Sequence, residues 1–361
     1  MKIMHVEAGR HLYGGARQVI HIIDGLNDLG VKNVLVCPPQ SDIASQVESP
    51  TELDEVVMKG DLDIFLVWRL LKSIQKHDPD IVHLHSRRGA DVFGGLAARL
   101  AHVPCVLSRR VDNPESEWVS KHKYGMYDHV ITISEAIKRV LLSQQVDAEK
   151  ITCVHSSIVA SEFQFPAQRA RFKEEFGVSE DAIVIGMIAQ LIKRKGHRYL
   201  LEVLPTLIQK HPGLQLVIFG QGPLDKELQQ QVSVSGLDSH VTFAGFRTDL
   251  PRWLGCLDLV VHPVDMEGLG VSLLQAAAAG VAIIGSNAGG VPEVVRHEEN
   301  GLIIEPGDAE GLARAVNELL SDPDQRKVMG ENGKRIVSSD FSVEKMVIGN
   351  LEVYQRVLAK A

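Results

Sequence analysis

The sequence has little cysteine, no long apolar run and no excess of positive charge. Its four cysteines, Cys37, Cys105, Cys153 and Cys256, form no Cys-x-x-Cys pair, which argues against a zinc site or a disulfide framework and favours a reducing compartment. No apolar stretch approaches the roughly 18 residues of a membrane span. The formal net charge is −8, whereas nucleic-acid binding requires a basic surface. We therefore expect no nucleic-acid partner.

The N-terminus also lacks the long apolar core of a signal peptide. Its first residues, MKIMHV, are typical of a strand and are followed by charged and glycine-rich residues. Together with the reducing compartment, this predicts a cytoplasmic protein. Any membrane contact is expected to be peripheral, at the inner face of the cytoplasmic membrane.

Short apolar runs alternate with helical patterns over 361 residues, a length that fits two domains. The runs are rich in valine and isoleucine and do not alternate with polar residues, which is typical of parallel strands buried on both faces. The predicted strands are Lys2–Val6, Val34–Cys37, Ile81–His85, Cys105–Ser108, Val130–Ile133, Ile151–Val154, Ile183–Ala189, Leu214–Gly220, Val241–Ala244, Leu257–His262, Val281–Gly285 and Leu302–Ile304.

We predict an α/β fold of two Rossmann-like, doubly wound domains that face a central cleft. Residues 1–165 form the first domain and residues 166–340 the second, because the residues around Pro166 carry little strand signal. An amphipathic helix within 341–361 is predicted to pack back on the first domain. Parallel sheets bind ligands at the carboxyl ends of their strands, so the cleft is the expected site.

The strongest local signal is the segment Leu257–Gly280, in which a strand leads through a loop into an alanine-rich helix. Glycines at such a junction let a ligand approach the backbone, and the free N–H groups of a helix start favour phosphate. Glu267, itself an anion, is better suited to sugar hydroxyls, and Gln275 lies about two helical turns further on. The alternative is a tight turn that only packs the helix. The loop and helix start comprise Glu267, Gly268, Leu269, Gly270 and Val271.

Cations follow another predicted strand. Lys193, Arg194 and Lys195 come after the run Ile183–Ala189, where a parallel sheet opens to its ligand crevice. Cations there can neutralise charge that develops on a leaving diphosphate. The alternative is a solvated surface turn.

Gly14 and Gly15 follow the first strand and suit close approach of a substrate or phosphate. The surrounding loop is not Gly-x-Gly-x-x-Gly, and the second strand ends at Cys37-Pro38 without an acid for an NAD ribose. A dehydrogenase is therefore disfavoured. Three Asp-x-Asp pairs border helices or turns and are interpreted as caps, so we expect no metal site.

Two arginine pairs follow predicted strands in the first domain. Arg87-Arg88 come after the strand that ends at His85, and Arg109-Arg110 come after the next. In a parallel sheet both pairs emerge at the same edge, where arginines suit phosphate or carboxylate. We expect these arginines and His85 to bind an anionic acceptor or a membrane surface that presents it. The alternative is solvated loop arginines.

Taken in order, these motifs resemble the retaining glycosyltransferases of family 4, which have the two-domain fold called GT-B. The resemblance covers nearly the whole chain. The matching segments are Gly14-Gly15, Lys195-Gly196, Phe219–Leu224, His262–Gly280, Ala288–Glu293 and Gly301–Asp308.

The resemblance implies roles for the matching positions. The donor diphosphate contacts Lys195 and Arg194, and the transferred sugar contacts Glu267. The remaining implied donor contacts are the backbone of Gly268–Val271 for phosphate and sugar, Gln275 for the ribose, Gly14-Gly15 for the diphosphate, and Phe246 and Arg247 for the base. Residues 1–165 would then be the acceptor side and 166–340 the nucleotide-sugar side.

Three positions depart from the family pattern. The family usually has a second glutamate where this chain has Gln275, and an arginine where it has Gln190. A histidine that helps the reaction often occupies the position nearest to Arg110. The departures leave open an inactive or regulatory GT-B subunit, and a sugar-nucleotide epimerase of similar fold is a further alternative.

The reaction implied by the resemblance transfers a hexose-type sugar from a nucleoside diphosphate, of the UDP type, with retention of the anomeric configuration. Front-side attack requires no metal or other cofactor if cations and the helix start balance the diphosphate. The acceptor is expected to be an anionic glycan or a lipid-linked glycan of a bacterial envelope, such as lipopolysaccharide.

Overall fold

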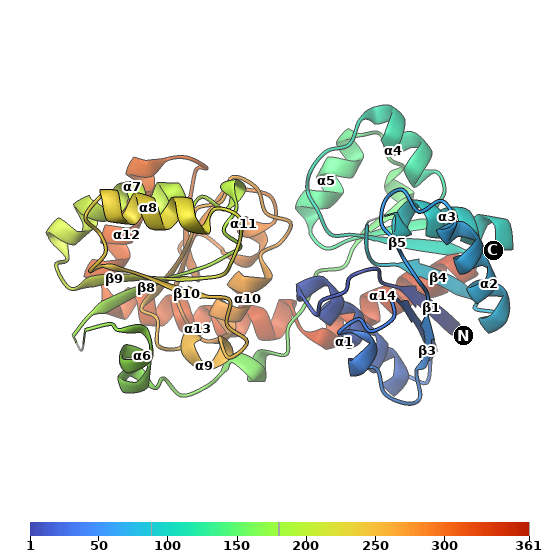
Figure 1. The fold of residues 1–361 in the computed structure, drawn as a ribbon, viewed down its shortest axis with the longest axis horizontal. Coiled ribbons are helices and arrows are strands. Elements are labelled where there is room, and N and C mark those ends of the chain that lie inside the picture. Colours follow the sequence, from blue (N-terminus) through green and yellow to red (C-terminus); the bar gives the residue numbers. More distant parts are fainter. Residues whose placement is uncertain (88, 180, 361) are drawn as a thin grey trace. The chain divides into compact units, whose positions relative to one another are not determined.

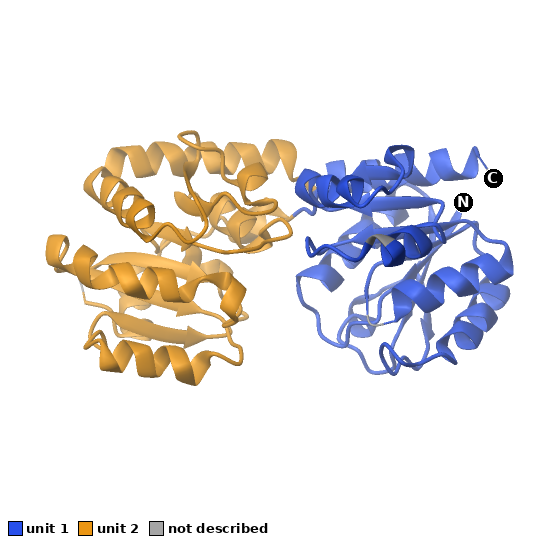
Figure 2. Ribbon diagram, turned by 90° about the horizontal axis from the view of Figure 1, so that it is seen from above, with its two compact units in different colours: residues 1–157, 343–361 blue, residues 158–342 orange. Residues whose placement is uncertain are grey.

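Each of the twelve predicted strand runs forms a strand in the computed structural model, which describes residues 1–87, 89–179 and 181–360. The strands belong to two separate sheets (Figure 1). The chain divides into two compact units, Met1–Ser157 with Val343–Ala361 and Ile158–Ser342 (Figure 2). Each unit is an α/β Rossmann-like domain.

The sheet of unit 1 is parallel throughout, with the strand order β3-β2-β1-β4-β5-β6-β7. The order reverses between β1 and β4, so the carboxyl ends of these two strands flank a crevice. Its strands are β1 (Lys2–Val6), β2 (Lys32–Cys37), β3 (Glu52–Glu55), β4 (Ile81–Leu84), β5 (Cys105–Arg109), β6 (His129–Thr132) and β7 (Ile151–Cys153).

The sheet of unit 2 is also parallel, with the order β10-β9-β8-β11-β12-β13 and a reversal between β8 and β11. Its strands are β8 (Ile183–Ile188), β9 (Leu214–Phe219), β10 (Val241–Gly245), β11 (Leu259–His262), β12 (Ile283–Ser286) and β13 (Gly301–Ile304). Strands β11 and β12 are buried along their whole length, as expected for a sheet covered on both faces.

Helices cover the two faces of each sheet. In unit 2, α7, α8 and α12 lie on one face and α9, α10 and α13 on the other (Figure 1). Unit 1 contains α1 (Gly14–Asp28), α2 (Leu66–His77), α3 (Ala90–Ala101), α4 (Glu117–Tyr124), α5 (Glu135–Ser143) and α14 (Val343–Leu358), with the 3₁₀ turns η1 (Ala44–Gln46) and η2 (Ala148–Lys150). Unit 2 contains α6 (Arg169–Phe176), α7 (His197–Lys210), α8 (Asp225–Val234), α9 (Pro251–Leu254), α10 (Val271–Ala278), α11 (Val291–Val294), α12 (Ala309–Ser321) and α13 (Pro323–Asp340), with η3 (Ala160–Phe163) and η4 (Lys193–Lys195).

Helix α14 packs on α1 and completes the core of unit 1. Val347 and Tyr354 of α14 join Ile22 and Leu26 of α1 in one apolar cluster. A Cβ on Gly25 would lie 2.5 Å from Cγ2 of Val347, so only glycine lets the two helices approach this closely. The C-terminal helix thus belongs to unit 1, although unit 2 precedes it in the sequence.

The structure differs from the sequence prediction in two places. The boundary between the units falls after Ser157 rather than after residue 165, because η3 packs on α9 and α10 of unit 2 and buries Phe163 there. Strand β3 was not predicted, because its residues ELDE are mostly exposed and form an edge strand without an apolar run.

Candidate functional site

Two loops meet at the strand-order reversal of unit 2. Turn η4 follows β8, and the loop from Pro263 to Gly270 follows β11. Gly196 has a φ of +74°, and a Cβ there would lie only 1.8 Å from the carbonyl oxygen of Pro263. The backbone N–H of Asp265 also donates to the carbonyl of Arg194 at 2.8 Å. Glycine at position 196 therefore permits the contact that brings Lys195 to the second loop.

Lys195, His262 and Glu267 form one buried polar cluster. The Lys195 Nζ pairs with Oε2 of Glu267, and the Nε2 of His262 lies 2.9 Å from the same oxygen. The other oxygen, Oε1, accepts the backbone N–H of Gly268 at 3.1 Å. Lys195 and His262 are buried, so the cluster is well shielded from bulk water. The fold thus brings Lys195 and the loop that carries Glu267 together.

The surroundings of Glu267 keep its carboxylate ionised. Burial alone would raise its pKa, but the hydrogen bond from His262 and the charge of Lys195 outweigh burial and hold the pKa well below its usual range. Burial lowers the pKa of His262 despite its bond to Glu267, so a neutral imidazole donates to the carboxylate. The carboxylate of Glu267 is thus held in place by the cation of Lys195 and by a hydrogen bond from the neutral ring of His262.

The start of α10 lies beside this carboxylate. Gly270, the residue before the helix, has a φ of +95°, and a Cβ on it would lie 3.6 Å from Cγ of Glu267. No side chain among the described residues caps the helix, so its first N–H groups are available to an anion. Gln275 is half-buried on the same helix. Lys195, Glu267 and Gly270 therefore lie next to one another in unit 2.

The other side chains predicted to contact the donor do not join this cluster. Arg194 is exposed. Arg247 follows the edge strand β10 and pairs with Asp249 and Glu175, which raises its pKa despite partial burial. Its guanidinium is therefore engaged by two carboxylates within the fold, and its contact with the base stays a prediction. Phe246 beside it is 55% exposed.

Two histidines in this region were missed by the sequence prediction. His262 was noted only as the end of a strand, although it holds Glu267. His197, the first residue of α7, is buried, and neither of its ring nitrogens has a hydrogen-bond partner among the described residues. Burial is the main cause that lowers its pKa to about 4, and His262 and Lys195 act in the same direction. Both could have been noticed from their positions in the sequence. His262 directly precedes the loop that carries Glu267, and His197 follows the turn that carries Lys195.

Unit 1 contains a cavity of about 440 Å³ at its own strand-order reversal. It is lined by residues that follow β1, β4 and β5 and by the start of α1. The predicted residues among them are Gly15, His85, Arg87, Arg109 and Arg110, whereas Gly14 is not among the lining residues and Arg88 lies outside the described residues. Several residues chosen from the strand ends thus line one cavity of unit 1.

Arg109 and Arg110 have different surroundings, although both were expected to bind the acceptor. Arg109 is buried, its Nη2 donates to the carbonyl of Asn113 at 2.6 Å, and its Nη1 lies 3.3 Å from Oε1 of Glu115. Lys123 also pairs with Glu115, at 3.0 Å. Arg109 thus has a charged partner inside the fold, but it also lines the cavity, and its Nε and Nη1 are buried without a hydrogen-bond partner among the described residues. Its role toward an anionic acceptor stays a prediction.

Arg110 also lines this cavity. Its Nε is buried without a hydrogen-bond partner among the described residues, and a Cβ on Gly15 would lie 3.8 Å from its Cδ. Burial lowers the pKa of Arg110, partly offset by the nearby charge of Glu7. Glu7 was not predicted: burial raises its pKa, while the N–H of Gly9 at 2.7 Å, and then Arg110, act in the opposite direction. A cation and a buried carboxyl group thus share the cavity.

The family models match these two units separately. Residues 13–161 match the model for Glycosyltransferase Family 4, and residues 168–336 match the model for Glycosyl transferases group 1. The chain is a glycosyltransferase of the GT-B fold. The two models together indicate the family 4 type, in agreement with the resemblance seen in the motifs.

Two relatives show what this chain is similar to. The GDP-mannose-dependent alpha-(1-6)-phosphatidylinositol monomannoside mannosyltransferase of Mycobacterium tuberculosis is 36% identical over 185 residues, which is 49% of this chain. The match spans only about half of that relative, 48% of its length. The lipopolysaccharide core biosynthesis glycosyltransferase LpsD of Rhizobium meliloti is 27% identical over the full length of both chains.

Solved structures confirm the fold of this glycosyltransferase. The crystal structure of Anabaena HepE in complex with UDP superposes with a TM-score of 0.85, covers 99% of this chain and 100% of its own, and is 22% identical. HepE has also been solved with UDP-glucose. In the described part of the present chain, no helix is both long and apolar enough to cross a bilayer.

Proposed function

We propose that this glycosyltransferase moves a hexose-type sugar from a nucleoside-diphosphate sugar of the UDP type to an acceptor hydroxyl, with retention of the anomeric configuration. The observation that carries the proposal is the cluster of Lys195, Glu267 and the start of α10. Lysine has three N–H donors, and one of them is occupied by Glu267. The other two and the helix N–H groups would hold the diphosphate, while Glu267 would accept from sugar hydroxyls.

The proposed step is a front-side displacement. The bond from the anomeric carbon to the phosphate oxygen breaks, the bond to the acceptor oxygen forms on the same face, and the leaving phosphate takes the acceptor proton. Lys195 and the first N–H groups of α10 stabilise the charge that develops on the phosphate. Bound in this way, the diphosphate needs no metal ion. Gln275 would face the ribose.

A thermal-shift screen tests the donor. Nucleoside diphosphates and then sugar nucleotides are added to the purified chain, and a ligand that binds the native state raises the melting temperature by mass action. We expect a uridine nucleotide to give the largest shift, by analogy with the nucleotide found in HepE. Release of UDP with an acceptor distinguishes a transferase from an inactive subunit, and isomerisation of the donor without an acceptor would identify an epimerase.

Removal of Lys195 should weaken the transition state. We expect Lys195→Ala to cost about 3 kcal/mol, or on the order of a hundredfold in kcat/KM, as for loss of one oxyanion donor. Steady-state release of the nucleotide measures the effect. The matched control is Lys210→Ala, which removes an exposed lysine at the other end of α7. Near-normal kcat in Lys195→Ala would contradict the proposed role.

We further propose that the acceptor is an anionic or lipid-linked glycan of a bacterial envelope, bound in the cavity of unit 1. Arg110 supplies the cation that such an acceptor requires. The lipopolysaccharide-core name of LpsD and the phosphatidylinositol mannoside named for the mycobacterial relative support an envelope substrate. Transfer from the donor to defined core oligosaccharides, with and without phosphate, tests this proposal.

An exposed apolar segment in unit 1 supports peripheral membrane contact. Leu62 is 94% exposed, and Ile64, Phe65 and Trp68 are also exposed, which is unusual for four large apolar side chains within seven residues. The loop that presents them is ordered, since Asp63 is buried, accepts the N–H of Lys59 at 2.8 Å and pairs with Arg69. Tryptophan and phenylalanine favour the interface of a bilayer.

The segment Leu62–Trp68 lies next to the loop that carries Arg87. A Cβ on Gly89 would lie 2.9 Å from the carbonyl oxygen of Gly60. Replacement of Phe65 and Trp68 by serine should lower sedimentation with anionic vesicles at least about fivefold, because the inserted apolar area is lost. Val234→Ser, an exposed apolar change in unit 2, is the control. Unchanged sedimentation of the double variant would rule out this surface.

A further inference from the structure

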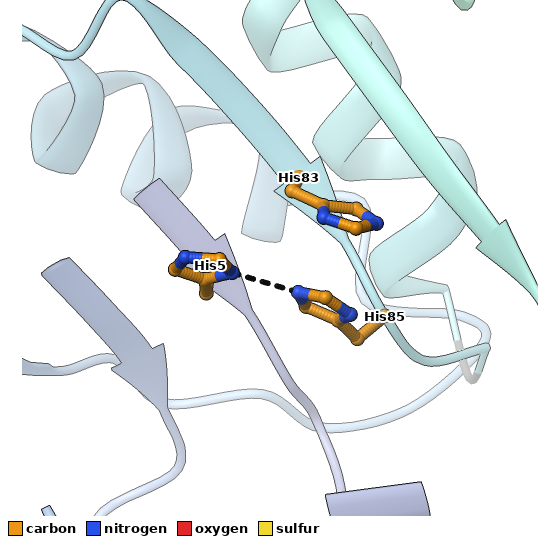
Figure 3. Close-up of side chains that lie close together, drawn as sticks. All are labelled: His5, His83 and His85. Atoms are coloured by element: carbon orange, nitrogen blue, oxygen red, sulfur yellow. Dashed lines mark hydrogen bonds between the residues drawn. The ribbon is translucent and has the colours of Figure 1, made fainter. Parts of the chain in front are cut away.

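Three buried histidines lie together in unit 1. His5 belongs to β1, His83 to β4, and His85 directly follows β4 (Figure 3). The ring centroids of His83 and His85 are 3.8 Å apart, and those of His5 and His85 are 5.2 Å apart. All three side chains are buried, and His85 also lines the cavity.

The hydrogen bonds of this cluster argue against a metal site. His83 places Nδ1 2.6 Å from the hydroxyl of Tyr354 and Nε2 2.8 Å from Oγ of Ser108. His5 places Nε2 3.1 Å from Oδ1 of Asn33 and Nδ1 2.9 Å from Nε2 of His85. Among the described residues, one ring nitrogen of the cluster is left without a partner, Nδ1 of His85. A metal site would need several free lone pairs at once.

The orientation of the Asn33 amide determines which atoms donate and which accept in the hydrogen bonds that join Asn33, His5 and His85. Its Nδ2 faces three oxygens, Oδ1 of Asn27 at 2.7 Å and the carbonyls of Val31 at 3.0 Å and Ile23 at 3.5 Å, so this atom is the amide nitrogen. The oxygen of Asn33 therefore faces His5, and Nε2 of His5 carries the proton. The Nδ1 of His5 is then a lone pair, which accepts from Nε2–H of His85.

Because the hydrogen bond to His5 requires the proton of His85 on Nε2, the Nδ1 of His85 is unprotonated and can accept a hydrogen bond. Burial, with smaller effects of His83, His5 and Arg110, lowers the pKa of His85 well below its usual value, so the ring is neutral near pH 7. A neutral ring with Nε2 protonated has an acceptor at Nδ1. A buried acceptor without a partner carries a cost that a ligand hydrogen bond removes.

Arg110 offers the complementary group. Its Nε–H is a buried donor without a partner in the described part of the chain, and Arg110 lines the same cavity as His85. A lone pair and an N–H in one cavity together suit a ligand with hydroxyl groups, because a hydroxyl donates one hydrogen bond and accepts another.

We propose that Nδ1 of His85, oriented through His5 and Asn33, accepts a hydrogen bond from one specific hydroxyl of the acceptor, and that Arg110 donates to an oxygen of the same molecule. His85 thus selects acceptors that carry this hydroxyl. The inference rests on the proposed transfer to an acceptor in unit 1. A site built to bind a hydroxyl discriminates strongly against an analogue that lacks it, because its own polar group is left unpaired.

The tautomer is tested without any substrate. Two-bond ¹H–¹⁵N correlation spectra of the full chain labelled with [¹⁵N]histidine distinguish a protonated Nε2 from a protonated Nδ1. We expect His5 and His85 both to carry the proton on Nε2, with the His85 signals assigned by their loss in His85→Gln. A protonated Nδ1 in His85 would overturn the inference, whatever the enzyme transfers.

The hydroxyl is tested by pairing enzyme variants with acceptor analogues. The donor is the sugar nucleotide with the largest thermal shift, and the acceptors are methyl glycosides and their monodeoxy analogues. His85→Gln keeps a donor toward His5 but removes the acceptor at Nδ1, whereas His85→Asn keeps an acceptor there. His129→Gln is the control, since His129 is a buried histidine on β6 whose Nε2 bonds to Thr152.

We expect one monodeoxy analogue to lose about ten- to hundredfold in kcat/KM with the wild-type enzyme and with His129→Gln. His85→Gln should show the same loss with the full acceptor and no further loss with that analogue, and His85→Asn should recover part of it. Equal discrimination by wild type and His85→Gln for every analogue would refute the role. If no donor is turned over at all, the proposed transfer fails, while the tautomer test still decides this inference.

Discussion

Glu267 depends on its neighbours for both its charge and its orientation. One carboxylate oxygen contacts Lys195 and His262, and the other accepts a backbone N–H. Removing one partner of a buried pair leaves the other charge uncompensated, which costs more than the pair itself contributes. His262, which touches Glu267 from the end of β11, is therefore a positioning residue for the proposed sugar contact.

Loss of His262 should change the pH dependence of the reaction. In His262→Leu the strongest hydrogen bond that lowers the pKa of Glu267 is gone, so burial raises that pKa. We expect the acid limb of the kcat/KM profile to move to higher pH and kcat/KM at neutral pH to fall about tenfold. His262→Gln, which retains an N–H donor, should restore much of both. An acid limb at the same pH in all three enzymes would show that His262 does not act through Glu267.

At the scale of the elements, two loops are held together by one glycine. The contact between Gly196 and Pro263 joins the turn after β8 to the loop after β11. The sequence predicted both loops, because each follows a run of valine and isoleucine. The contact itself was not predictable, since it depends on β8 and β11 being neighbours in the sheet.

The charged partners of the cavity residues also differ in a way that the sequence did not show. Arg109 and Arg110 are adjacent in the chain, but Arg109 pairs with the nearby Glu115, whereas Arg110 lies close enough to Glu7 for its charge to act on the pKa of Arg110. Glu7 follows the first strand without any motif, and its partner Gly9 is local whereas Arg110 is distant in sequence. Strand ends can therefore be read from the sequence, whereas the charged partners of the side chains that follow them depend on the fold.

Substitution of Gly196 tests the contact between the loops. Gly196→Ala places a Cβ within 1.8 Å of a backbone oxygen at a φ that alanine disfavours, so the turn must shift. We expect a loss of more than about 1 kcal/mol in stability together with weaker nucleotide binding. Gly213→Ala, where the nearest heavy atom is 3.8 Å away, is the control, and melting curves with and without UDP measure both. A full UDP-induced shift in Gly196→Ala would contradict this coupling.

At the scale of the whole molecule, buried neutral histidines set the acid limit of stability. Burial is the main cause that lowers the pKa of His5, His129 and His197 from 6.5 to about 4. Between these pH values the unfolded chain binds protons that the folded chain does not, so stability falls as the pH falls through this window. Asp249, whose pKa is lowered to about 2 mainly by Arg247, loses its contribution only at still lower pH.

The midpoint of thermal unfolding should therefore decrease between pH 6.5 and pH 4. His129→Gln should show a shallower decrease than the wild type, because one proton-linked group has been removed. Calorimetry across this range measures the slope, and equal slopes in the two proteins would exclude His129 as a contributor. The wild type should vary little between pH 7 and pH 8.

The position of α14 has a consequence for how the protein is made. Unit 2 is continuous in sequence and can fold as soon as it leaves the ribosome, whereas the apolar face of α1 stays bare until α14 has been synthesised. Unit 1 therefore completes its folding last, although its first strands leave the ribosome first. A nascent chain arrested before Val343 should hold unit 2 in native form and recruit chaperones to Ile22 and Leu26.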